Sequence, residues 1–295
     1  MLQAVGHLAR RSGILAARRR QYIGAPGGAI AEAAAASSET GASFAAWICG
    51  GSPILTEFIS SVGYDAVVID LQHGVGDVAS MLAAISAAAA PSNPGAIPRS
   101  RPQAIVRVSQ NLDGEIYKAL DAGANALICP MINSVEDCEQ FVRAAKYPPE
   151  GHRSFGPHRA ILGWPGSRGD FVRAANATIE TYAMLETRGA INELDGILSI
   201  DGLSGVFIGP NDLGLALGHD PTDAPEGEVL EMVEHVLARA HRHNKKAAIF
   251  CSEPGTAKRM AEAGFDMVCV GMDVAWAAGG AAKALAAAKG KAPLP

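Results

Sequence analysis

The strongest constraint on the fold of this chain is a regular alternation of two kinds of segment from residue 43 onward. Eight short apolar runs occur at residues 44–49, 66–70, 104–108, 126–131, 181–186, 205–209, 247–250 and 267–271. Each precedes a longer segment with apolar residues at helical spacing, at 54–62, 78–90, 112–122, 134–145, 190–198, 229–243, 256–263 and 274–288. Apolar strands that alternate with amphipathic helices are typical of a parallel sheet whose outer face is covered by helices.

Eight such units in roughly 250 residues predict an α/β protein with a closed (β/α)8 barrel, the TIM barrel. The alternative is an open, doubly wound sheet, which usually carries a glycine-rich GxGxxG turn for nucleotide binding. The chain lacks that turn, so the barrel is favoured. We therefore expect a single barrel domain over residues 43–295.

Residues 1–42 differ from the rest and are expected to form a basic extension and linker outside the barrel. The first 24 residues contain five arginines and no acid, and the first acidic residue is Glu32. A basic segment rich in Ala and Leu is typical of an amphipathic transit peptide, which would place the protein in the mitochondrial or another organelle matrix. A disordered basic tail on a cytoplasmic protein is the alternative. Residues 25–42 are rich in Ala, Gly and Ser, as linkers are.

Charge and composition argue against several classes of partner and site. The formal net charge is −5 and no dense basic stripe occurs beyond the N-terminus, so we expect no nucleic-acid partner. No apolar run is long enough to span a membrane. The cysteines form no CxxC pair, which favours buried reduced thiols over disulfides or a zinc site. They are Cys49, Cys129, Cys138, Cys251 and Cys269.

Polar side chains gather where the predicted strands end. In a parallel barrel, catalytic residues lie at the carboxyl ends of the strands and in the loops that follow them. Five residues meet that condition: Asp70, His73, Arg107, Glu186 and Asp212. We expect them to converge at one rim.

The segment 205–214, Gly-Val-Phe-Ile-Gly-Pro-Asn-Asp-Leu-Gly, predicts a buried strand that stops at Gly209 and a helix that Pro210 opens. Asp212 would then lie beside backbone N–H groups that no helix carbonyl can satisfy, and these amides suit a substrate carboxylate. Glu186 ends the preceding strand, so the two carboxylates could hold one divalent cation such as Mg²⁺ or Mn²⁺. The alternative is that Glu186 caps a helix and Asp212 closes a turn.

Asp70-Leu-Gln-His73 places an imidazole three residues after a strand-end carboxylate. A carboxylate within reach of a histidine fixes its tautomer and suits it to act as a general base, whereas the alternative is an exposed loop histidine. Arg107 interrupts an apolar run and needs an anion, and its planar fork fits a carboxylate or an enolate oxygen. The alternative for Arg107 is a buried ion pair with Asp70 or Asp121. Asp121, at a helix end, suits a capping or ion-pair role.

Other common mechanisms lack their residues. A Schiff base needs a lysine at the carboxyl end of a strand, but Lys118 lies within a predicted helix and Lys245 and Lys246 precede their strand. No GxSxG turn or Cys/His nucleophile spacing occurs. Two acids, one arginine and one histidine fit chemistry on an enolate that a metal stabilises.

One connection, from 147 to 180, is much longer than the others. Long loops of this kind are often lids or partner contacts. The polar residues that it carries are His152, Arg153, His158 and Arg159.

Taken together, the motifs resemble the HpcH/HpaI family of class II, metal-dependent 2-oxo-acid aldolases, such as the hydroxy-oxoheptanedioate and dehydro-deoxyglucarate aldolases. The resemblance runs in order from residue 43 to 272. The segments that carry it are 63–73 (GYDAVVIDLQH), 119–124 (ALDAGA), Pro130-Met131, 147–153 (YPPEGHR), 184–186 (MLE) and 205–213 (GVFIGPNDL). It implies a barrel whose last helix is exchanged between subunits, usually within hexamers.

The resemblance also implies a role for each candidate residue. The metal ligands fall on Glu186 and Asp212, and the base with its partner acid falls on His73 and Asp70. The enolate-binding arginine falls on Arg107. A further acid falls on Asp121, contributed across the subunit contact or to the hydrogen-bond network of the site.

Two positions depart from the family pattern. Gln72 stands where studied members have Glu before the base, and Met184 stands where they have Gln. Both changes remove polar contacts near bound substrate, which bears on the identity of the aldehyde. Residues 91–101 read as a surface insertion.

The activity that the resemblance implies is reversible cleavage of a 4-hydroxy-2-oxo acid into pyruvate, or a close 2-oxo acid, and an aldehyde. The segment of Gly209, Pro210, Asn211 and Asp212 would hold the carboxylate, and His73 would remove the 4-hydroxyl proton. One alternative is a related barrel of the citrate-lyase-beta or malyl-CoA type that cleaves acyl-CoA esters, with Arg153 and Arg159 as the candidates for a basic groove. The other is a non-catalytic, oligomeric barrel.

Overall fold

The computed structural model describes residues 40–89 and 101–290. The predicted basic extension lies outside the described residues apart from 40–42, and so does the predicted insertion apart from residue 101. Neither prediction is therefore tested by the structure.

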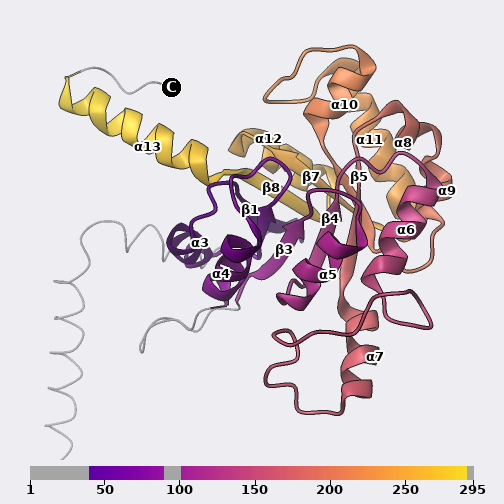
Figure 1. Cartoon of the computed structure of the whole chain (residues 1–295). Helices are drawn as coiled ribbons and strands as arrows, with labels where there is room; N and C mark the ends of the chain where they lie inside the picture. Colours follow the sequence, from indigo (N-terminus) through magenta and orange to yellow (C-terminus); the bar gives the residue numbers. More distant parts are fainter. Residues whose placement is uncertain (1–39, 90–100, 291–295) are drawn as a thin grey trace, which may run out of the picture.

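Eight parallel strands close into a barrel in sequence order, as the alternating pattern predicts (Figure 1). The predicted (β/α)8 barrel is confirmed, and each apolar run matches one strand within two residues. The strands are β1 (Ser43–Ile48), β2 (Ala66–Asp70), β3 (Gln103–Arg107), β4 (Ala126–Cys129), β5 (Glu180–Leu185), β6 (Gly205–Ile208), β7 (Lys246–Cys251) and β8 (Met267–Met272).

Helices follow the strands and cover the outside of the barrel. They are α3 (Pro53–Ser60), α4 (Val78–Ala88), α5 (Asp113–Asp121), α6 (Val135–Ala145), α7 (Arg168–Thr178), α8 (Arg188–Asn192), α9 (Leu194–Leu198), α10 (Pro210–Leu217), α11 (Gly227–Arg242), α12 (Pro254–Ala263) and α13 (Asp273–Ala288). The predicted helix at 190–198 is two short helices, and α7 falls within the long connection where no helix was expected. No helix of the described residues is long and apolar enough to cross a membrane.

The strands are apolar on both faces because both faces are buried. Side chains such as Val68, Ile105 and Phe207 fill the barrel interior. Their neighbours, such as Val106 and Leu127, pack against the surrounding helices. This two-sided burial explains the uninterrupted apolar runs in the sequence.

The last helix, α13, is the exception to this packing. It projects away from the barrel in Figure 1, and of its residues only Asp273 is buried. Its contacts with the barrel lie at its beginning, where Trp276 stacks on Tyr64 with ring centroids 6.0 Å apart.

Candidate active site

The five residues predicted to converge do lie at one rim, which we call the carboxyl rim. Asp70 and Arg107 are the last residues of β2 and β3, and Glu186 directly follows β5. Asp212 is in the first turn of α10, after β6. His73 lies in the loop that follows β2.

Asp70 and Arg107 form a buried, bidentate ion pair. The register of β2 and β3 places the two residues directly opposite each other. Nε of Arg107 donates to Oδ1 of Asp70 at 2.8 Å, and an Nη atom donates to Oδ2 at 2.7 Å. The ion pair weighed as an alternative for Arg107 is therefore present, and it orients the guanidinium at the barrel mouth.

The pKa of Asp70 reflects two opposing effects. Burial alone would raise it, because a charged carboxylate is poorly solvated there, but the hydrogen bonds and charge of Arg107 and two backbone N–H groups outweigh burial. The pKa of Asp70 is therefore lowered from its ordinary value. Asp70 stays ionised at neutral pH.

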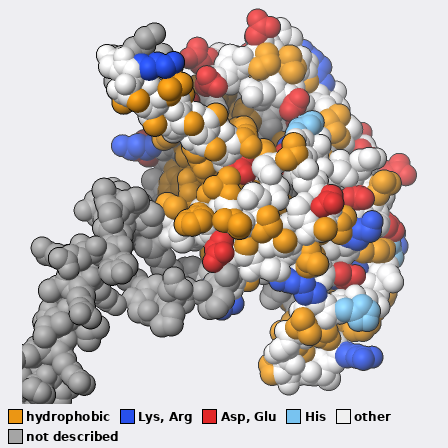
Figure 2. All heavy atoms as spheres, turned by 60° about the vertical axis from the view of Figure 1, so that its left-hand side comes forward, with side chains coloured by type: hydrophobic (Ala, Val, Ile, Leu, Met, Phe, Trp, Pro, Cys, Tyr) orange, Lys and Arg blue, Asp and Glu red, His pale blue; other side chains and the backbone are white. Residues whose placement is uncertain are grey.

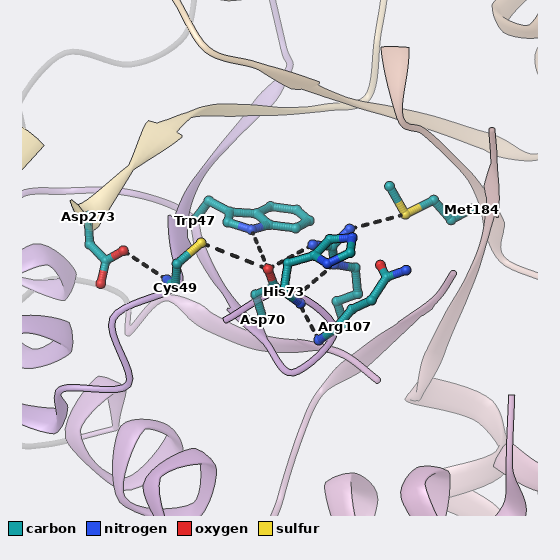
Figure 3. A network of polar contacts seen from close by, with 8 residues as sticks. Trp47, Cys49, Asp70, His73, Arg107, Met184 and Asp273 are labelled. Carbon is teal, nitrogen blue, oxygen red and sulfur yellow. Dashed lines mark hydrogen bonds and ion pairs between the residues drawn. The ribbon is translucent and has the colours of Figure 1, made fainter. Parts of the chain in front are cut away.

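Trp47 and Met184 hold the other sides of Arg107 (Figure 3). The Trp47 ring lies 4.8 Å from the guanidinium carbon, and its indole N–H donates to Asp70 at 3.3 Å. The remaining Nη of Arg107 points to the sulfur of Met184, 3.8 Å away. Asp70 takes the N–H of Nε and one N–H of an Nη atom, so the other Nη binds no carboxylate of the described residues and can donate to an anion.

The Asp70 carboxylate also orders the loop that carries His73. Its Oδ1 accepts from the backbone N–H groups of Gln72 and His73 at 2.9 and 3.3 Å. A Cβ at Gly74 would lie 2.1 Å from the carbonyl oxygen of Asp70, so only glycine permits this turn. The His73 side chain is exposed. Within the described residues the carboxylate bonds the backbone of His73 and not its imidazole, so a tautomer-fixing role for Asp70 stays a prediction.

Glu186 is buried, and one of its oxygens is held in place. Oε1 accepts from the backbone N–H of Met131 at 2.7 Å. Met131 adopts a left-handed backbone, φ 55°, which is unusual for a residue other than glycine. Burial raises the pKa of Glu186, and the charge of Asp212 adds to that rise, while the Met131 N–H and the charge of Arg107 oppose it.

The start of α10 lies against Glu186. A Cβ on Gly209 would lie 2.8 Å from the end of the Met184 side chain and 3.1 Å from Oε2 of Glu186. A side chain at this position would therefore have to displace the ends of the Met184 and Glu186 side chains. Pro210 occupies the first turn, as predicted, and Asp212 is exposed in that turn. The N–H groups of this turn that have no helix carbonyl as partner can donate hydrogen bonds to an anion.

The donor set at β5 and β6 fits a hard divalent cation. Oε2 of Glu186 and both oxygens of Asp212 make no hydrogen bond to the described residues, and the charge of Asp212 contributes to the raised pKa of Glu186. Mg²⁺ is commonly held by one or two carboxylates, with water and substrate completing its shell. The described residues contain no group of three or more His, Cys, Asp or Glu side chains arranged for a metal.

Asp121 does not join this site within the chain. It ends α5 at the opposite, amino rim, and its Oδ1 accepts from Arg153 at 2.7 Å. The connection that carries Arg153 lies between α6 and β5, so it also lies at the amino rim (Figure 1). The prediction of a lid over this chain's own site is therefore wrong for that loop. A contact between subunits stays a prediction for Asp121 and the loop.

The cysteines described by the structure are free, as predicted, and Cys49 alone is only partly buried. Burial raises the pKa of the Cys49 thiol to about 12, with the charges of Asp70 and Asp273 contributing. A thiol with so high a pKa is a poor nucleophile. Cys49 is therefore poorly suited to act as a nucleophile.

Three residues of the site were missed in the sequence. Trp47 has no distinguishing pattern because it lies within an apolar run, and Met131 was noted only as part of the Pro130-Met131 segment of the family resemblance, without a role in the site. Asp273 directly follows the last strand, so the rule that selected Asp70 and Glu186 could have found it.

Comparison with known proteins gives a consistent family. The family described as HpcH/HpaI aldolase/citrate lyase matches residues 43–278. A hydroxypyruvate/pyruvate aldolase from Rhizorhabdus wittichii is 39% identical over 249 residues, which cover 83% of this chain and 93% of the relative. A 5-keto-4-deoxy-D-glucarate aldolase from an Enterobacter species is 31% identical over 229 residues, covering 77% and 85%.

Solved structures agree with the barrel. An HpcH/HpaI aldolase/citrate lyase family protein from Burkholderia cenocepacia has a TM-score of 0.75 at 27% identity, covering 84% of this chain and 95% of its own. The citrate synthase SbnG has a TM-score of 0.73 at 27% identity, covering 85% and 94%. Because proteins with different named reactions share this fold, the reaction must be argued from the site.

Proposed function

This chain belongs to the HpcH/HpaI aldolase/citrate lyase family, and the names of its relatives indicate an aldolase, which is a carbon–carbon lyase. On that basis we propose a specific reaction for it. It cleaves a 4-hydroxy-2-oxo acid reversibly into pyruvate, or a close 2-oxo acid, and an aldehyde. The reaction in this proposal depends on a divalent cation, for which Glu186 and Asp212 are the candidate ligands.

One observation carries the proposal. Arg107, oriented by a buried carboxylate, directs its remaining donor toward Met184. Met184 in turn lies against Gly209, beside the free amides of α10 and Oε2 of Glu186. The guanidinium of Arg107, the Glu186 carboxylate and the start of α10 thus all lie near the Met184 side chain at the barrel mouth. This combination suits a 2-oxo acid, which has a carboxylate next to a carbonyl.

Binding follows from these positions. The backbone of Gly209, Asn211 and Asp212 holds the substrate carboxylate at the start of α10. Glu186 and Asp212 would hold a divalent cation, which would supply charge stabilisation at the 2-oxo oxygen. Arg107 donates to the oxygen on which the enolate charge develops, and its prior orientation by Asp70 removes the cost of ordering it during the reaction.

Cleavage needs a base for the 4-hydroxyl proton. His73, in the loop after β2 at this rim, carries an imidazole, the side chain most often used as a general base, and it takes that proton as the bond between C3 and C4 breaks. The products are the aldehyde and the enolate of the 2-oxo acid, which then gains a proton at C3. In the reverse direction His73 returns the proton to the new hydroxyl group.

We further propose that the chain works as a homo-oligomer in which α13 is exchanged between subunits. Exposed apolar side chains lie on the face that carries α3, α4 and α13, where Figure 2 shows hydrophobic atoms gathered. They are Ile54, Phe58, Val78, Leu82, Val274 and Leu285. An exposed apolar helix that projects from the barrel favours a contact in which a partner subunit covers it. Import into an organelle matrix, with the cytoplasm as the alternative, is proposed from the arginine-rich first 24 residues.

The test uses pyruvate release from a series of 4-hydroxy-2-oxo acids, measured with a coupled dehydrogenase in Mg²⁺, in Mn²⁺ and after chelation. The Glu186→Gln variant should lower kcat/KM by on the order of 1000-fold, since loss of the cation removes its charge stabilisation. Glu262→Gln is the matched control, because Glu262 is an exposed glutamate of α12 whose ion pair with Lys258 is on the surface. It should stay within about twofold of the parent.

Full activity of the Glu186→Gln variant in the presence of chelator would contradict the proposal. Inhibition of the parent enzyme by free coenzyme A would instead favour the acyl-CoA alternative. Absence of divalent-cation binding by calorimetry would favour a non-catalytic barrel.

A further inference from the structure

The buried carboxylate of Asp273 joins the start of α13 to the loop after β1. Its two oxygens accept from the backbone N–H groups of Cys49 at 2.8 Å and Gly50 at 2.9 Å. Figure 3 shows Asp273 and Cys49 on the side of the site away from Met184. Asp273 is only 1% exposed, although it lies at the rim.

This carboxylate has no cationic partner among the described residues. Its charge is instead stabilised by two amides of the β1 loop, by the N–H of Val274 and by the positive end of the α13 dipole. Burial of an unpaired carboxylate is costly unless several hydrogen bonds hold it. Asp273 therefore fixes the β1 loop and the helix start relative to each other.

The β1 loop in turn touches the loop that carries His73, backbone against backbone. The carbonyl oxygen of Cys49 accepts from the N–H of Val75 at 2.9 Å. A Cβ on Gly51 would lie 3.1 Å from Cα of Gly76, so no side chain separates the two loops. A displacement of residues 49–51 must therefore move residues 74–76 as well.

A second contact leads to the same place. The thiol of Cys49 lies 3.8 Å from Oδ2 of Asp70, the carboxylate that binds the backbone N–H of His73. The first turn of α13 and the loop of His73 are thus linked through one short segment of the chain. Glu186 and Asp212, which follow β5 and β6, lie outside this segment.

We propose that Asp273 is a positioning residue for the reaction. It sets the place of His73 by holding residues 49–51 against residues 74–76. The inference rests on the proposed function for the role of His73. It assigns to the first turn of α13 a part in proton transfer that is separate from cation binding.

The experiment compares Asp273→Asn and Asp273→Ala with the parent enzyme in the full chain. The amide keeps one acceptor and the alanine keeps none, so kcat should fall by about 10-fold and about 100-fold, because small displacements of a catalytic group have effects of this size. KM for the hydroxy-oxo acid and the affinity for Mn²⁺ should stay within about twofold, since their ligands lie elsewhere. Asp201→Asn, in an exposed turn after α9, is the control.

Amide hydrogen exchange gives a readout that does not depend on activity. In Asp273→Ala the peptides that cover 47–51 and 71–77 should both exchange faster, while those of β5 and β6 stay unchanged. Gly50→Ala is a second variant in case Asp273→Ala does not fold. A Cβ there would lie 2.9 Å from Oδ2 of Asp273, so it should disturb the same contact with Asp273 intact.

Two results would overturn the inference. One is an Asp273→Ala enzyme whose kcat, divided by the number of sites that bind Mn²⁺, equals that of the parent. That result would mean that Asp273 only affects how many molecules fold correctly and not how fast each one turns over. The other is hydrogen exchange in Asp273→Ala that is faster at residues 47–51 but unchanged at residues 71–77. Failure of the proposed function itself can be told apart from failure of this inference, because the parent enzyme would then be inactive on 4-hydroxy-2-oxo acids.

Discussion

At the scale of single residues, the site depends on the ion pair between Asp70 and Arg107. Both side chains are buried, and the carboxylate accepts both from the guanidinium and from the backbone of the His73 loop. Removing the charge would leave Arg107 buried without its partner. One carboxylate thus orients the guanidinium of Arg107 and the loop that carries His73, the proposed base.

Asp70→Asn should destabilise the protein by roughly 3–5 kcal/mol at pH 7, the usual effect of breaking a buried pair. The pKa of Asp70 is lowered in the folded state, so the ion pair contributes fully above the ordinary value of 3.8 and is lost as pH falls through the lower, folded-state pKa. The difference in unfolding free energy between parent and variant should therefore be constant from neutral to mildly acidic pH and shrink only in stronger acid. Urea unfolding at several pH values measures it, and a gap that already closes between pH 7 and pH 5 would contradict the lowered pKa.

The sequence identifies which residues reach the rim, but it leaves open whether Arg107 pairs with Asp70, with Asp121 or with a bound anion. Asp70, Arg107, Glu186 and Asp212 follow from the rule that strand ends carry function. The pairing of Asp70 with Arg107 depends on the register between β2 and β3, which the apolar pattern leaves open. Trp47 was missed because an aromatic residue within a strand is usually core, and Asp273 because α13 was read only as the closing helix.

At the scale of elements, glycines let the loops of the carboxyl rim approach one another. Gly74 lies where a Cβ would meet the carbonyl oxygen of Asp70 at 2.1 Å and that of Cys49 at 3.1 Å. These are backbone atoms, which cannot move aside as a flexible side chain would. The loop of His73 therefore has its shape only with glycine at that position.

Gly74→Ala should lower kcat by at least about 100-fold, because it displaces His73 and the amides that bind Asp70. Gly255→Ala, in α12, is the matched control, since a Cβ there meets nothing within 4 Å. It should keep full activity and gain up to about 1 kcal/mol from helix propensity. Parental turnover in Gly74→Ala would show that the loop tolerates rearrangement and that its geometry is not required.

Strands are predicted more accurately than helices in this chain, for a physical reason. Burial on both faces makes each strand an uninterrupted apolar run, whereas α7 buries little more than Phe171, Ala175 and Asn176 and so has no clear apolar stripe. Its start carries a capping box between Ser167 and Asp170, a signal that could have located it. The break between α8 and α9 occurs at Glu193, whose side chain accepts from the N–H of Val135, a contact not visible in sequence.

At the scale of the whole molecule, α13 joins the candidate site to the proposed contact between subunits. Its first residue is bound to the β1 loop, and the rest of the helix projects from the barrel (Figure 1). A chain that ends at residue 276 keeps Asp273 and the stacking of Trp276 on Tyr64. It lacks the part of α13 that we propose a partner subunit covers.

Truncation after residue 276 should therefore reduce the oligomer to smaller species, as measured by light scattering after size-exclusion chromatography. Loss of an apolar interface weakens association in proportion to the area that it buried. Lys283→Ala, a substitution within α13 that keeps its length, serves as the control and should keep the parental mass. A truncated chain of unchanged mass would contradict helix exchange.

The central claim is that Glu186 and Asp212 hold a divalent cation at which a 2-oxo acid becomes an enolate. The most direct measurement is exchange of the pyruvate methyl protons for deuterium, followed by NMR with the parent enzyme in D₂O, with and without EDTA. It needs no knowledge of the aldehyde. We predict exchange with Mg²⁺ or Mn²⁺, loss of exchange on chelation, and recovery when the cation is restored. Exchange that continues unchanged in EDTA, or none with either cation, would contradict the claim.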